Sequence, residues 1–178
     1  MTFDEFKASQ ILLKLKPYRK PPYSEGIERT FDFGSLDDGV RDTMIAEWNV
    51  QHNEVPTLAY VGQEEGWVLL TSRRIIWSRP GDKHSVEYLR IKQLGWSSGP
   101  DGERERPNMV DEWIQTPAGL RDCKTGSPWL FILDEVGHRY EVLLERGPLV
   151  VAIWNCILQL RRLESRKDVL IRDLELKA

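Results

Sequence analysis

The spacing of apolar residues divides the chain near Pro56. Before that point apolar residues recur every three or four positions, which is the period of a helix with one buried face. Thr2 and Glu5 stand at the spacing of a capping box and predict a first helix over residues 3–16. The prolines and glycines of residues 17–34 then predict an extended connector.

A second helix is predicted from Ser35, because Asp38 follows at the spacing of an N-terminal cap. The apolar residues of this segment fall on one helical face. We expect that face to cover the core, although it could also meet a partner. Its members are Leu36, Val40, Met44, Ile45 and Trp48.

From residue 57 the pattern becomes that of β-strands. Residues 66–77 carry β-branched and aromatic side chains on both sides of residues 71–74, which predicts two strands joined by a tight turn. About seven antiparallel strands are expected in all. The others lie at residues 57–61, 85–91, 94–97, 128–134 and 139–144, with turns at 80–83 and 135–138.

Two further segments complete the pattern. Residues 98–127 interrupt the strands with an insertion of about 30 residues, far longer than the usual connection of about 4 to 6, so this segment is either functional or disordered. Gly147 and Pro148 begin a helix whose apolar face runs to residue 165, as packing on a sheet requires. Residues 166–178 either extend that helix or fold back.

Composition narrows the possible partners and compartments. The 178 residues are 40% hydrophobic and 30% charged, which is typical of a globular protein. A net charge of -3 gives no general attraction to nucleic acid, so no nucleic-acid partner is expected. Cys123 and Cys156 form no C-x-x-C pair, the N-terminus lacks a signal-peptide pattern, and no apolar run could span a membrane. These features predict a cytoplasmic protein.

The hairpin at residues 66–77 resembles the second and third strands of bacterial pleckstrin-homology-like (PH-like) and GRAM-type domains. Leu70, Thr71 and Arg74 stand at the matching positions of their motif, and residues 86–91 resemble their fourth strand. The last predicted hairpin and helix resemble the end of the same domain. The resemblance therefore implies an α+β fold, an antiparallel β-barrel or sandwich of about seven strands capped by a C-terminal α-helix.

This resemblance also implies a division of the chain. Residues 1–54 form an N-terminal helical extension, residues 55–165 form the PH-like domain with the insertion at 98–127, and residues 166–178 form a tail. PH domains that bind phosphoinositides use a basic loop between their first two strands. The loop at 62–66 is acidic here and should repel a phosphorylated headgroup.

No group of residues in the sequence indicates catalysis or a metal. Histidines fall at a helix end or in and beside turns, and Cys156 falls on an apolar helical face. The acidic clusters lack the spacing of a calcium loop, and no phosphate-binding loop occurs. We therefore expect no enzyme activity and no cofactor. The histidines are His52, His84 and His138.

Recognition of another protein is the function that remains, because tryptophan and arginine dominate binding hot spots. Trp67, Trp77, Trp129 and Trp154 are assigned to the core. The predicted protein-binding residues are Trp96, Arg104, Arg106 and Trp113, in or beside the insertion. By analogy with small bacterial proteins of this kind, an adaptor or a toxin-neutralising (immunity) role would suit such a module.

The alternative is peripheral attachment to an anionic membrane through a basic C-terminal helix. Helical spacing could bring several basic side chains onto one face there. The candidates are Arg161, Arg162, Arg166 and Lys167.

Overall fold

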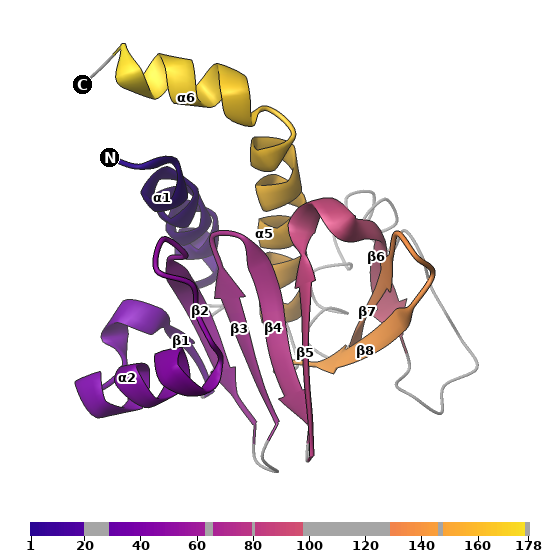
Figure 1. The fold of residues 1–178 in the computed structure, drawn as a ribbon. Coiled ribbons are helices and arrows are strands. Elements are labelled where there is room, and N and C mark those ends of the chain that lie inside the picture. The colour runs from indigo at the N-terminus through magenta and orange to yellow at the C-terminus, as the bar shows by residue number, and fades with distance from the viewer. Residues whose placement is uncertain (20–28, 63–65, 80, 98–128, 146–147, 177–178) are drawn as a thin grey trace.

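The structure is a computed structural model that describes residues 1–19, 29–62, 66–79, 81–97, 129–145 and 148–176 (Figure 1). Over these residues the fold is α+β, with two antiparallel sheets. The first sheet, sheet A, runs in the order β1 (Thr30–Asp32), β2 (Pro56–Val61), β3 (Trp67–Thr71), β4 (Arg74–Arg79) and β5 (Asp82–Glu87). The second, sheet B, runs β6 (Ile91–Ser97), β7 (Trp129–Asp134) and β8 (Arg139–Leu143).

No strand pairing joins the two sheets within the described residues, so they do not close into a barrel. The helices are α1 (Phe3–Leu15), α2 (Asp38–Glu47), α5 (Pro148–Glu164) and α6 (Lys167–Glu175). Figure 1 shows α2 on one face of sheet A, and α1 and α5 on the other. Short 3₁₀ turns cover Lys16–Arg19, Phe33–Ser35 and Tyr88–Arg90.

Both faces of the β3–β4 hairpin are buried, which explains why its sequence is a continuous run of apolar residues and does not alternate between apolar and polar ones. Leu70 and Ile75 face a core shared with sheet B, α1 and α5. Leu69 and Ile76 face a smaller cluster under α2, together with Trp48. The predicted face of α5 is buried as expected, with Ile153, Trp154 and Ile157 among its members.

Helix α1 begins as predicted. The Glu5 main-chain N–H donates to Thr2 Oγ1 at 3.2 Å, and the Thr2 N–H donates to the Glu5 carboxylate at 2.6 Å. Its Ile11 and Leu15 are buried in the main core.

The prediction for the start of α2 was wrong, because Asp37 and not Ser35 caps it, accepting from the Gly39 N–H at 2.9 Å. Its predicted apolar face is only partly buried. Met44 packs beneath the helix, whereas Val40 and Ile45 are 43% and 39% exposed. The apolar face predicted for α2 is therefore wider than the part of the helix that sheet A buries.

Two strand predictions also need correction. The connector predicted at 17–34 contains β1, which pairs Thr30 with Tyr60 at the edge of sheet A. Three residues are too few to show a strand period. The strand predicted at 85–91 is instead β5 from Asp82, then a 3₁₀ turn at 88–90, then β6 from Ile91. The chain passes from one sheet to the other at that turn.

A buried polar network holds this crossover in place. The Glu54 carboxylate accepts from Arg74 Nε at 3.0 Å and from Thr71 Oγ1 at 2.5 Å. Thr71 Oγ1 in turn accepts from the Arg74 main-chain N–H at 3.0 Å, which closes the β3–β4 turn. The Tyr88 hydroxyl lies 2.8 Å from the carbonyls of both Thr71 and Arg74. One network therefore fixes the segment before β2, the β3–β4 turn and the crossover.

Tyr88 acts as the donor in this network. Burial raises the pKa of the Tyr88 hydroxyl well above the ordinary value, so the phenolic oxygen keeps its proton at neutral pH. The Leu70, Thr71 and Arg74 motif of the sequence therefore has a structural role, because these residues form and flank the β3–β4 turn.

Substitution of Glu54 with alanine should lower the free energy of unfolding by about 3 kcal/mol, because Arg74 would be left partly buried without its partner. Asp38→Ala is the matched control, since it removes an exposed ion pair with Arg41 and should cost less than about 1 kcal/mol. Urea denaturation measures both. Equal losses in the two variants would contradict the assignment of the network as a structural centre.

Candidate functional site

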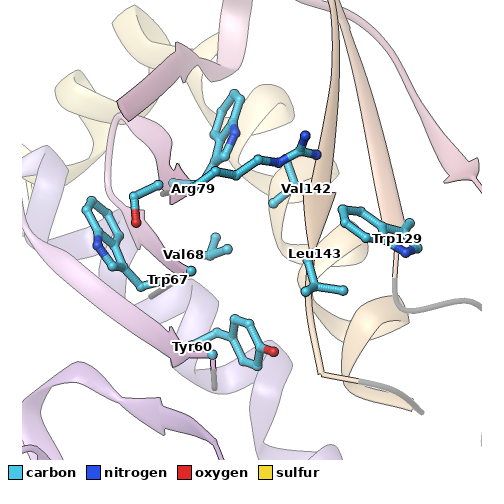
Figure 2. Close-up of a pocket in the computed structure, with 11 residues that line it drawn as sticks. Tyr60, Trp67, Val68, Arg79, Trp129, Val142 and Leu143 are labelled. Atoms are coloured by element: carbon cyan, nitrogen blue, oxygen red, sulfur yellow. The ribbon is translucent and has the colours of Figure 1, made fainter. Parts of the chain in front are cut away.

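A hollow lies between the two sheets, at the end of sheet A opposite the β3–β4 turn (Figure 2). We call it the seam hollow. Its volume is about 190 Å³. Side chains from β2, β3 and β4 line one side, and side chains from β7 and β8 line the other. The residues that line it include Tyr60, Trp67, Val68, Trp129, Val142 and Leu143.

Arg79 crosses this seam from sheet A to sheet B. The carbon at the centre of its guanidinium lies 5.3 Å from the centroid of the Trp129 ring. The guanidinium also donates to the main-chain carbonyl of Glu141 in β8. A charge held over an aromatic face in this way is attracted by the ring quadrupole. Arg79 therefore links two sheets that no strand pairing joins in the described residues.

The side of β8 away from β7 is a free strand edge in the described sheets. The Asp134 N–H donates to the carbonyl of His138 at 3.0 Å, which makes this a hydrogen-bonded pair. Such pairs alternate along an antiparallel ladder. The main-chain groups of Glu141 and Leu143 therefore point to the free edge, which agrees with the bond from Arg79 to Glu141.

Helix α2 supports the rim of the hollow. The Trp48 and Trp67 rings are stacked with centroids 3.4 Å apart and planes at 11°. Trp48 is the buried residue that caps the C-terminus of α2, so the stack limits the positions that the half-buried Trp67 can take. Burial also raises the pKa of the Tyr60 hydroxyl, which lies on the same wall in the neighbouring strand β2. The residues at the rim are thus aromatic, and the Trp67 ring itself packs on the α2 face of sheet A.

A more open groove of about 660 Å³ adjoins Arg79 on the other side. His84 Nε2 lies 2.8 Å from Asp82, and His138 Nδ1 lies 3.3 Å from Asp134. The Tyr140 ring packs near both imidazoles, with centroids at 5.6 Å and 6.3 Å. Each histidine thus has its own carboxylate partner, which suits a structural role. His84 lies within β5 and not beside a turn as predicted.

The described residues do not assemble an obvious reaction centre. No group of three or more His, Cys, Asp and Glu side chains among them could hold a metal ion. Burial raises the pKa of the Cys156 thiol to about 12, so it is not a thiolate at neutral pH. No helix in the described part of the chain is both long and apolar enough to cross a bilayer.

The residues predicted for protein binding are only partly placed. Trp96 lies in β6, where its main chain pairs with Leu130. Arg104, Arg106 and Trp113 lie outside the described residues. Ser97 pairs with Trp129, so both ends of the connection at 98–128 meet beside the hollow.

The residues of the membrane alternative fall on two helices rather than one. Arg161 and Arg162 lie in the last turn of α5, whereas Arg166 and Lys167 stand at the start of α6. A break at residues 165–166 separates them. Acidic residues share α6 with these bases, namely Asp168, Asp173 and Glu175.

The assignment of four tryptophans to the core was right for two of them. Trp77 and Trp154 are buried, whereas Trp67 and Trp129 are half-buried and line the hollow. Both are the first residues of their strands, which places them at the rim of the sheets. The place of each tryptophan at the start of a predicted strand was the feature of the sequence that could have indicated a position at the rim. Nothing in the sequence pointed to Tyr60, Arg79 or Leu143.

A second polar cluster clamps α1 to the body of the protein. Lys7 Nζ lies 2.9 Å from Asp4 Oδ1, and it also contacts the Glu164 carboxylate in α5. Arg73, in the β3–β4 turn, lies 2.8 Å from Asp4 Oδ2. Lys7 is 1% exposed, so its charge is stable there only because carboxylates surround it. The charges are mutually satisfied, and we interpret the cluster as structural.

Acid should weaken this clamp. Burial alone would raise the pKa of Asp4, but hydrogen bonds from Arg73, Lys7 and Ser72 outweigh it and lower the pKa to about 2. The carboxylate therefore contributes about 2 kcal/mol of stability above its unfolded pKa, and this is lost as pH falls toward 2. The measurement is the unfolding free energy of wild type and Asp4→Asn from about pH 6 down to about pH 2. The difference should shrink with acid, and a constant difference would contradict the assignment.

We compared the chain with models of protein families, with curated proteins and with solved structures, and found no match in any of the three.

Proposed function

We propose that this chain is a non-catalytic, PH-like module that binds another protein at the seam between its two sheets. The strand order supports the PH-like part of the proposal. Four consecutive antiparallel strands, β2 to β5, are followed by three, β6 to β8, and then by α5. The sequence resemblance implies about seven antiparallel strands followed by a helix, and β1 is an addition at one edge.

The observation that carries the binding role is the aromatic rim of the seam hollow. Trp67, Trp129 and Tyr60 stand around a concave apolar surface, with Arg79 between them and the neighbouring groove. Tryptophan, tyrosine and arginine are the residue types that dominate protein-binding hot spots. The predicted contact through residues 98–127 fits the same surface, because Ser97 and Trp129, the described residues on either side of that segment, pair with each other and Trp129 lines the hollow.

The non-catalytic part of the proposal has two supports. The described histidines 84 and 138 have carboxylate neighbours of their own, and Cys156 is buried and protonated. An adaptor or toxin-neutralising role in the cytoplasm suits such a module. Membrane attachment has less support, because the four basic residues lie on two helices and α6 carries three acidic side chains.

The proposal is tested by affinity capture from native lysate with Leu143→Arg as the blocking variant. Leu143 is 40% exposed at the rim, so arginine there should leave the fold intact and place a charge in the hollow. The matched control is Leu158→Arg, which changes a leucine of 38% exposure on α5. A variant with residues 99–126 replaced by a Gly-Ser linker tests the insertion.

The expected result is one stoichiometric partner retained by wild type and by Leu158→Arg and lost by Leu143→Arg. Thermal unfolding should show that all the variants remain folded. Retention of the same partner by both Leu143→Arg and the linker variant would refute binding at the seam.

A further inference from the structure

We propose that the seam hollow holds one uncharged aromatic or branched aliphatic side chain, presented by an extended segment of the partner that pairs with the free edge of β8. This rests on the proposed function and specifies the chemistry that the partner must bring. Three features of the hollow support it: its size, its charge and the strand edge at its rim.

Size separates a side chain from a larger ligand. The hollow has a volume of about 190 Å³. A buried apolar cavity of about 150 Å³ can hold a benzene ring, whereas sites for cofactors and drug-sized ligands run from about 300 to 1,000 Å³. The hollow therefore suits one ring or one branched chain. A cofactor or an acyl chain would leave most of its apolar surface outside.

Charge favours a neutral occupant. Arg79 is the only charged residue among the described residues that line the hollow, and its guanidinium already contacts Trp129 and the Glu141 carbonyl. A cation would be repelled by this guanidinium, and an anion would have to displace the contacts that the guanidinium already makes. An uncharged side chain meets neither cost.

The edge of β8 supplies the contact that an extended segment needs. The main-chain groups of Leu143 point to the free edge, and this residue, 40% exposed, lines the hollow. A strand pairing there would place alternate side chains on one face, so that one of them can enter the hollow. Main-chain hydrogen bonds would give general affinity, and the hollow would select the side chain.

The test uses short peptides as probes. The first is the blocked pentapeptide Thr-Thr-Trp-Thr-Thr, which is uncharged and favours an extended chain. The second carries glycine in place of tryptophan, and the third carries N-methyl groups on alternate amides, which removes the edge hydrogen bonds. Decanoate serves as the acyl-chain probe. Binding is followed by NMR through the methyl groups of Val68 and Val142, which line the hollow.

The tryptophan peptide should shift both sets of methyl resonances saturably. The glycine and N-methylated peptides should bind at least about tenfold more weakly, and decanoate should give no saturable shift. Leu143→Trp should abolish binding of the tryptophan peptide by filling the hollow. Leu158→Trp, a control of similar exposure on α5, should retain it.

Equal binding of the tryptophan and glycine peptides would overturn the side-chain pocket, and equal binding of the N-methylated peptide would overturn the strand pairing. Saturable decanoate binding or no binding by any peptide would also overturn this proposal. These outcomes are separable from failure of the proposed function. If Leu143→Arg still loses the captured partner, the seam is the binding surface and only the occupant named here is wrong.

Discussion

The buried ion pair between Glu54 and Arg74 is the interaction on which the rest of the structure depends. The Glu54 side chain is inaccessible to solvent, so its charge is tolerable only with a complete set of donors. Arg74 and Thr71, which flank the turn between β3 and β4, supply them together with the main-chain N–H of Gln51. That requirement fixes the register of the hairpin at this end. A slip of one residue would exchange the two faces of a strand. The register set at the turn therefore also holds at the other end of the β3–β4 hairpin.

The far end of the hairpin is where the candidate site lies. In the observed register Trp67 is opposite Ser78, and the next residue of β4 is Arg79, at the seam. Tyr88 extends the same constraint to the crossover, because its hydroxyl bonds the carbonyls of the turn. The position of sheet B relative to sheet A therefore depends on the polar network, although the hollow is apolar.

Local rules predicted the parts of the fold whose cause is local. The capping box at Thr2 and Glu5, the hairpin at 66–77 and the amphipathic α5 each depend on neighbours in sequence. The failures have tertiary causes. The edge strand β1 is ordered by pairing with β2, and the chain turns at Tyr88 because the turn carbonyls bind its hydroxyl. No periodicity within either segment reports those partners.

The candidate site could be predicted only in part for the same reason. Trp67 and Trp129 look like core residues because aromatic residues in strands usually are, yet they begin their strands and so reach the rim. Arg79 and Leu143 gain their roles from a contact between two sheets that are far apart in sequence.

An arginine at this seam also explains how an open sandwich is stable. A free strand edge beside an apolar hollow invites unwanted pairing, and proteins blunt such edges with charged side chains. Arg79 does this at one point, the Glu141 carbonyl, while its contact with Trp129 holds the sheets together. Leu143 lies beyond that point along β8 and remains partly exposed. The same side chain thus protects part of the edge and leaves the part beside the hollow available for recognition.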